Sequence, residues 1–112
     1  MLLYLEPDVV VLIASGSIFE DRNESAGINF SLICMVGGIE NFRPELSFEW
    51  NHSDGTGFEE INITSNEIDF SPLKLSEAGI YMCQVNIRSS LLRSDLSFMS
   101  MPPYIIRAFG KY

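Results

Sequence analysis

The chain has 112 residues, the length of a single domain, and 46% of them are hydrophobic, which is enough for a core of its own. Its 15 acidic residues exceed its 7 basic ones, and the formal net charge of −8 argues against binding to nucleic acid. The longest purely apolar run, residues 9–14, is far too short to cross a bilayer, so direct membrane insertion of this chain is not expected.

Short β-rich runs separated by turn residues dominate the sequence, and no window holds a 3.6-residue apolar period, so the class is all-β. Residues 1–7 are an N-terminal flank without the basic region of a secretory signal, and the chain is interpreted as part of a larger protein. An apolar stretch at 8–14 stops at Ser15-Gly16 and resumes around Ile18-Phe19, as in an edge strand that splits into two halves. The polar residues 20–27 are expected to form a turn.

Two alternating strands follow. The first places a set of apolar residues and the first cysteine on one face: Ile28, Phe30, Leu32 and Cys34. The second does the same with Leu46, Phe48 and Trp50, and it is expected to end in the turn-rich residues 51–57. Trp50 is therefore predicted to point inward.

The second half of the chain continues the pattern. Two short strands are predicted around residues 61–63 and 68–70. A longer strand at 79–87 places Tyr81, Cys83, Val85 and Ile87 on one face, and a last strand contains Leu96 and Phe98. Pro102-Pro103 is expected to end regular pairing, because proline cannot donate to a ladder. The domain is thus predicted at 8–101, with 102–112 as a strand end, a linker or the start of a next domain.

Residues 73–83 identify a family. Their sequence, LKLSEAGIYMC, resembles the Leu-x-x-x-Asp-x-Gly-x-Tyr-x-Cys signature of the immunoglobulin superfamily. The resemblance covers residues 8–101, and its signature positions occur in the right order: Cys34, Trp50, Leu73, Gly79, Tyr81 and Cys83.

The resemblance implies an immunoglobulin-like Greek-key β-sandwich of two antiparallel sheets, joined by one disulfide between Cys34 and Cys83. In such domains the glycine permits a tight corner, and the tyrosine hydroxyl ties that corner to nearby backbone, which gives these roles to Gly79 and Tyr81. Glu77 departs from the pattern because it stands where Asp is usual. The 15 residues between Cys34 and Trp50 imply a long loop around 37–41, and the 48 residues between the cysteines favour the I-set over neighbouring sets.

The compartment decides whether the cysteines pair, since cytosolic muscle members of the family keep them as free thiols. Four N-glycosylation triplets, far more than chance would give, favour an extracellular location. Alternation turns three of the acceptors outward and places the fourth in a turn; the acceptors are Asn29, Asn51, Asn62 and, in the turn, Asn23.

The sequence lacks the parts of an enzyme, with one histidine, no cysteine to spare and no phosphate-binding loop. We predict no catalysis, no cofactor and no small-molecule substrate for this chain, although a parent protein could carry an enzymatic domain such as a kinase. His52 is expected to be a solvated loop residue. Asp54, Glu59 and Glu60 lack the alternating ligand positions of a calcium loop, so no metal site is predicted.

Recognition is the remaining function, and the hairpin after residue 87 offers candidates for partner binding: Arg88, Leu91, Leu92 and Arg93. The alternative is that one of the two leucines tucks under the hairpin. Apolar residues at outward positions are expected to be covered by neighbouring strands, by a glycan or by a partner; these are Ile33, Met35, Ile80 and Met82.

By resemblance, such domains occur in cell-adhesion molecules and in receptor ectodomains, including those of receptor tyrosine kinases. The first hypothesis is a module that binds a protein ligand or a like domain. The second is a spacer that sets reach within an ectodomain, and the third is a cytosolic structural domain of the muscle type.

Overall fold

A computed structural model describes residues 7–15, 23–25, 29–70 and 73–109 of the chain. Its strands are β1 Val10–Ser15, β2 Asn23–Ser25, β3 Phe30–Gly37, β4 Glu45–Ser53, β5 Phe58–Ile61, β6 Glu67–Phe70, β7 Gly79–Arg88, β8 Leu96–Met99 and β9 Tyr104–Phe109. Two short 3-10 turns, η1 Glu40–Phe42 and η2 Leu75–Glu77, lie before β4 and β7.

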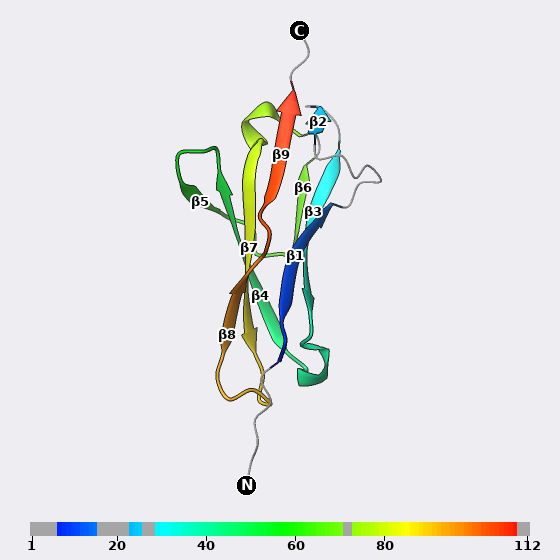
Figure 1. Cartoon of the computed structure of the whole chain (residues 1–112), viewed down its shortest axis with the longest axis vertical. Helices are drawn as coiled ribbons and strands as arrows, with labels where there is room; N and C mark the ends of the chain where they lie inside the picture. Colours follow the sequence, from blue (N-terminus) through cyan, green and yellow to red (C-terminus); the bar gives the residue numbers. More distant parts are fainter. Residues whose placement is uncertain (1–6, 16–22, 26–28, 71–72, 110–112) are drawn as a thin grey trace.

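The strands form two sheets that face each other (Figure 1). Among the described residues, one sheet has three strands in the order β1-β3-β6, and the other has six, in the order β2-β9-β7-β4-β5 with β8 also paired to β7. All pairs are antiparallel except β2 with β9. The predicted all-β sandwich is confirmed.

The polar stretch at 20–27 was expected to be a turn, and this prediction is wrong for Asn23–Ser25, which form β2. These three residues pair in parallel with Arg107–Phe109 of β9. Backbone pairing with a neighbouring strand outweighs the weak local preference of polar residues for turns. The predicted half-strand around Ile18-Phe19 lies outside the described residues.

The prediction that Pro102-Pro103 ends regular pairing is also wrong. Strand pairing to β7 stops after Met99 but resumes at Tyr104, so β8 and β9 both lie along β7. The two prolines occupy the break between these strands, where the ladder needs no donor from them. Residues 104–109 therefore belong to the six-stranded sheet, and Tyr104 and Ile106 are buried in the core.

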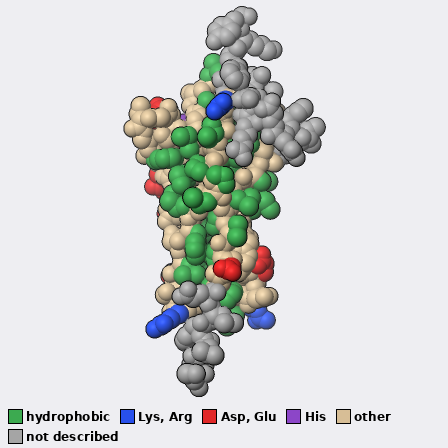
Figure 2. Space-filling view, viewed as in Figure 1, with side chains coloured by type: hydrophobic (Ala, Val, Ile, Leu, Met, Phe, Trp, Pro, Cys, Tyr) green, Lys and Arg blue, Asp and Glu red, His purple; other side chains and the backbone are tan. Residues whose placement is uncertain are grey.

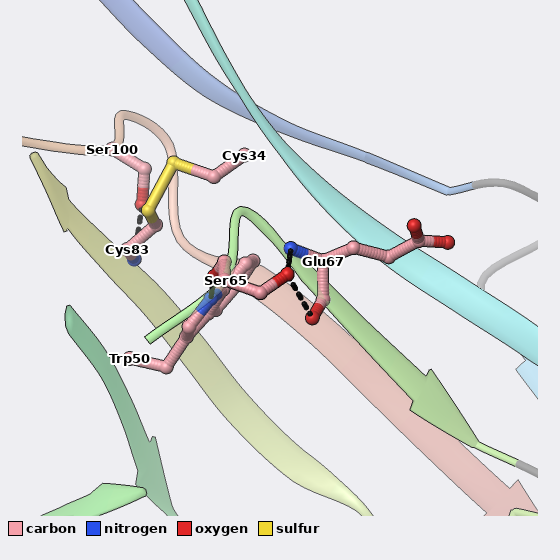
Figure 3. Close-up of a disulfide and its surroundings, with 6 residues drawn as sticks. All are labelled: Cys34, Trp50, Ser65, Glu67, Cys83 and Ser100. Atoms are coloured by element: carbon pink, nitrogen blue, oxygen red, sulfur yellow. Dashed lines mark hydrogen bonds between the residues drawn. A yellow bond between two sulfur atoms is a disulfide. The ribbon is translucent and has the colours of Figure 1, made fainter. Parts of the chain in front are cut away.

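A disulfide between Cys34 of β3 and Cys83 of β7 joins the two sheets, with 6.2 Å between the Cα atoms (Figure 3). Trp50 is fully buried and lies directly opposite Cys83 in the register of β4 and β7. Its indole nitrogen donates a hydrogen bond to the carbonyl of Ser65 at 2.8 Å, so the polar edge of the ring is satisfied. The cross-link and the indole therefore form the centre of the core.

The break between β8 and β9 is tied to both sheets. Ser100 is fully buried; its amide donates to the carbonyl of Cys83 at 2.7 Å, and its hydroxyl accepts from the amide of Cys83 at 3.0 Å. The next amide, that of Met101, donates to the carbonyl of Val11 in β1 at 3.0 Å. This short segment thus holds β1 of one sheet against β7 of the other.

A tight corner precedes β7 and is held by Tyr81, whose hydroxyl donates to the carbonyl of Glu77. Burial raises the pKa of the Tyr81 hydroxyl, and the negative charge of Glu77 adds to the effect. The carboxylate of Glu77 accepts from the amide of Lys74 at 2.8 Å, so the residue that departs from the family pattern caps η2. Gly79 has a φ of +136°, and a Cβ there would lie 2.2 Å from the carbonyl oxygen of Ser53.

Loss of the disulfide is predicted to lower the free energy of unfolding by about 4 kcal/mol, because the cross-link closes a long loop in the unfolded chain. The double variant Cys34→Ala/Cys83→Ala, compared with the unchanged chain in guanidinium melts, measures this difference. Mass spectrometry of the native protein without reductant provides the control. Two thiols that react with an alkylating agent would contradict the bond.

Tyr81→Phe is predicted to destabilise the domain by about 1 to 3 kcal/mol without unfolding it, because the carbonyl of Glu77 loses its buried partner. The phenyl ring keeps the stacking contact with His52 and the edge contact with Phe70, so packing is preserved. Urea melts report the change. An unchanged midpoint would mean that the hydroxyl contributes nothing to the corner.

Candidate functional site

The outer face of the six-stranded sheet is apolar at one end. Alternation along β7 buries Tyr81 and Cys83 and turns Ile80 and Met82 to the outside, where both remain half-buried. Ile80 lies opposite Ile105 of β9 on one side and Ser53 of β4 on the other, and Ser53 lies opposite Phe58 of β5. A row across four strands therefore carries Ile105, 38% exposed, at one edge and Phe58, 50% exposed, at the other.

Met99 extends this row, and a second methionine follows it in the break after β8. Met99 of β8 lies opposite Gln84 on the outer side of β7 and is 44% exposed. Met101, in the break after β8, is 71% exposed. Figure 2 shows hydrophobic side chains gathered along the middle of the molecule, over β7, β9 and β1. We call the set on the larger sheet the apolar face, and its members are Phe58, Ile80, Met82, Met99 and Ile105.

The other end of the same outer surface is polar and hollowed. A groove of about 540 Å³ lies there, lined by residues 45–47 of β4, 86–88 of β7 and 95–97 at the start of β8. Arg88 and Asp95 face each other across its end, with 3.8 Å between Nε and Oδ2. Both side chains are at least 70% exposed, so this ion pair contributes little to stability.

The hairpin that joins β7 to β8 carries the residues predicted to bind a partner. Leu91 stands at the tip and is 52% exposed, whereas Leu92 is partly buried and packs against the core. Arg88 and Arg93 are exposed, and Arg88 is held beside Asp95. Ser89 fixes the hairpin, because its hydroxyl donates to the carbonyl of Phe42 and accepts from the amide of Leu91. Of the two leucines, only Leu91 is free to make a contact.

The predicted glycosylation acceptors differ in their surroundings. Asn29 and Asn62 are exposed, at the start of β3 and after β5. Asn51 is half-buried in the middle of β4, between Glu60 of β5 and Met82 of β7 in register. Asn23 lies in β2 rather than in the predicted turn. The fold thus leaves Asn29 and Asn62 the more open of the acceptors whose side chains are described.

The expectation that His52 is a solvated loop residue is wrong. The residue lies in β4, is half-buried, and stacks on the ring of Tyr81 with 4.6 Å between ring centroids. Its Nε2 donates to the carbonyl of Ala78 at 2.8 Å. The sequence contained the signal, since His52 is two residues after the inward Trp50 and alternation places both on one face.

A hollow of about 260 Å³ beside His52 is lined by residues that include Asp54, Thr56 and Glu59. Thr56 donates to the carboxylate of Asp54 from its hydroxyl at 2.6 Å and from its amide at 3.1 Å, and these bonds lower the pKa of Asp54. Among the residues that the structure describes, no group of histidine, cysteine and acidic side chains is arranged to hold a metal ion. Nor does any helix within the described ranges have the length and apolarity to cross a membrane.

Comparison with known families gives one match, to the model described as "Immunoglobulin domain", over residues 25–93. The matched span is more than half of the chain and runs from the end of β2 to the hairpin after β7. A search of the curated proteins found no match.

The two leucines of the hairpin are predicted to respond differently to the same substitution. Leu92→Ser should lower the free energy of unfolding by about 1 kcal/mol or more, because its side chain packs against the core. Leu91→Ser should change it by no more than about 0.5 kcal/mol, since the tip is exposed. Parallel denaturant melts compare the pair, and equal effects would contradict this placement of the two side chains.

Proposed function

Because the chain belongs to the immunoglobulin family, we propose that it is an extracellular recognition module that binds a protein ligand or a like domain. Immunoglobulin folds are typically not enzymes, and they commonly mediate protein–protein interactions. The proposal rests above all on the apolar face, where three hydrophobic side chains are between 38% and 50% exposed.

Exposure of apolar side chains to water is unfavourable in free energy. A contiguous apolar patch with a polar surround is typical of an interaction site, because burial against a partner removes its area from solvent. The apolar face stands on hydrogen-bonded strands of a sandwich with a cross-linked core, so a partner would meet a surface that is already ordered. The polar groove at the other end adds hydrogen-bonding groups to the same surface.

The hairpin stands at the end of that groove, and we assign it the rim of the binding surface. Leu91 offers an apolar contact, and Arg88 and Arg93 offer positive charge to an acidic partner. Leu92 takes part indirectly, since its packing against the core positions the hairpin. The centre of the surface is then the apolar face rather than the hairpin.

An extracellular location, in a cell-surface receptor or adhesion protein, is part of the proposal. The Cys34–Cys83 disulfide supports it, because such bonds persist in oxidising compartments. The glycosylation triplets support it as well. For the subtype we propose the I-set. One additional strand, β5, lies beside β4, whereas constant-type domains have none there and variable-type domains have two.

A spacer role is the second candidate, and the course of the chain favours it. Figure 1 shows that β1 starts at one end of the long axis and β9 finishes at the opposite end. A module with this course separates whatever precedes it from whatever follows it by the length of the sandwich. Binding and spacing are compatible in one domain, and the experiment below tests the binding role alone.

We predict that Phe58→Glu/Ile105→Glu abolishes partner binding while the fold persists, because each substitution places a charge in the apolar face. The matched control is Val10→Glu, which changes a residue of similar exposure, 54%, on β1 of the other sheet. The three proteins are compared by sedimentation velocity for self-association, and as fluorescent multimers for staining of cells.

The expected result is association or staining by the unchanged chain and by the control, with a loss of at least about tenfold in the double variant. Thermal melts establish that all three proteins are folded. Equal association and staining by all three, or a monomer that stains no cell type, would remove the binding role and leave the spacer.

A further inference from the structure

The outer face of the three-stranded sheet carries a second group of exposed apolar side chains. Val10 and Leu12 of β1 are 54% and 39% exposed, and Met35 of β3 is 52% exposed. Leu12 lies directly opposite Met35 in register, and Ile33, half-buried, lies two residues before Met35 on the same side of β3. We call these four residues, Val10, Leu12, Ile33 and Met35, the β1–β3 face.

The glycosylation acceptor Asn29 lies at the end of this face. Phe30 and Leu32 are buried, so alternation along β3 places Ser31, Ile33 and Met35 on the outer side. Asn29, which precedes Phe30 and is exposed, continues the outer series. At about 3.3 Å per residue, Asn29 is about 13 Å from Ile33 and about 20 Å from Met35 along the strand.

The surroundings suit a sugar chain. Pyranose rings have apolar C–H faces that pack on aliphatic side chains, and their hydroxyl groups donate to carboxylates. Two exposed acids of β6 border the path from Asn29, because Asp69 lies opposite Ser31 and Glu67 lies opposite Ile33. A sugar chain that leaves Asn29 along β3 would therefore meet the hydrogen-bond acceptors of β6 first and the apolar side chains of the β1–β3 face beyond them.

Attachment also favours a glycan over a separate protein on this face. A sugar chain bound to Asn29 stays at a high effective concentration beside the face, whereas a free partner loses translational freedom on binding. Its bulk would also obstruct the approach of another protein. A glycan on Asn29 is thus placed to cover side chains of the β1–β3 face that the rest of the described chain leaves exposed.

We propose that an N-linked glycan on Asn29 lies along β3 and covers the β1–β3 face. In its attachment, the side-chain nitrogen of Asn29 forms a bond to C1 of the first sugar and loses one proton. The bond broken is that between C1 and the pyrophosphate oxygen of the lipid-linked oligosaccharide donor, and the lipid pyrophosphate leaves. The proposal rests on the extracellular location proposed above.

Hydroxyl-radical labelling tests the cover directly. The 112-residue chain is secreted from eukaryotic cells behind a cleavable leader, and half of the sample is freed of N-glycans by an amidase under native conditions. Peptide mass spectrometry then measures oxidation of each side chain. Labelling of Leu12 and Met35 should rise several-fold after glycan removal, while Leu91 at the hairpin tip, which serves as an internal control, should not change.

Substitutions in the triplet at residues 29–31 distinguish the effect of the Asn29 glycan from the effects of glycans at the other acceptors. Ser31→Ala removes the acceptor triplet but keeps Asn29, and it should label as the glycan-free protein does. Ser31→Thr preserves the triplet and should label as the unchanged chain does. Asn62→Gln removes a different acceptor and should leave Leu12 and Met35 protected.

Three outcomes would overturn the proposal. In the first, Asn29 carries no glycan although other triplets do. In the second, Asn29 carries a glycan but Leu12 and Met35 label equally with and without it. In the third, their protection persists without glycan and depends on protein concentration, which would assign the face to a second copy of the chain. A secreted protein with no glycan at any triplet would count against the extracellular proposal as well.

Discussion

The register of β7 is the constraint on which the rest of the molecule depends. This strand pairs with β4, β8 and β9, and a shift by one residue would exchange its buried and exposed side chains. Three contacts oppose such a shift: the disulfide at Cys83, the hydrogen bond from Tyr81 to Glu77, and the pair of hydrogen bonds with Ser100. The apolar face exists because this register turns Ile80 and Met82 outward.

The sequence predicted the parts of the fold that depend on alternation. Period-two patterns placed Cys34, Trp50 and Cys83 on inner faces, and the family resemblance then paired the cysteines. What it missed depends on contacts between distant segments. The polar residues of β2 become a strand only because β9 lies beside them, and β9 was not predicted since two prolines precede it. The strand was predicted to end before His52 because the residues that follow are polar and typical of turns. In the structure, the alternation that places Trp50 inward continues to His52.

The candidate surfaces could also be predicted only in part from alternation within single strands. Outward apolar residues could be recognised one strand at a time, and Ile33, Met35, Ile80 and Met82 were all identified in this way. Their grouping required the register of neighbouring strands, which brings Phe58 and Ile105 into one row and sets Leu12 beside Met35. If the glycan of Asn29 covers the smaller sheet, that side of the sandwich is closed to a protein partner, and binding is left to the larger sheet. Such a division would fix which way the domain faces its neighbours.

The opposite placement of the two chain ends has a mechanical consequence. Tension applied to a tethered protein would enter at β1 and leave at β9, along the direction of the strands. The hydrogen bonds of β1 to β3 and of β2 to β9 would then be loaded in shear, so that many must break together rather than one after another. The disulfide sets a limit on extension, because residues between Cys34 and Cys83 are bridged covalently and cannot lengthen the chain. Under force, the domain would yield only its two terminal segments and keep its cross-linked centre closed.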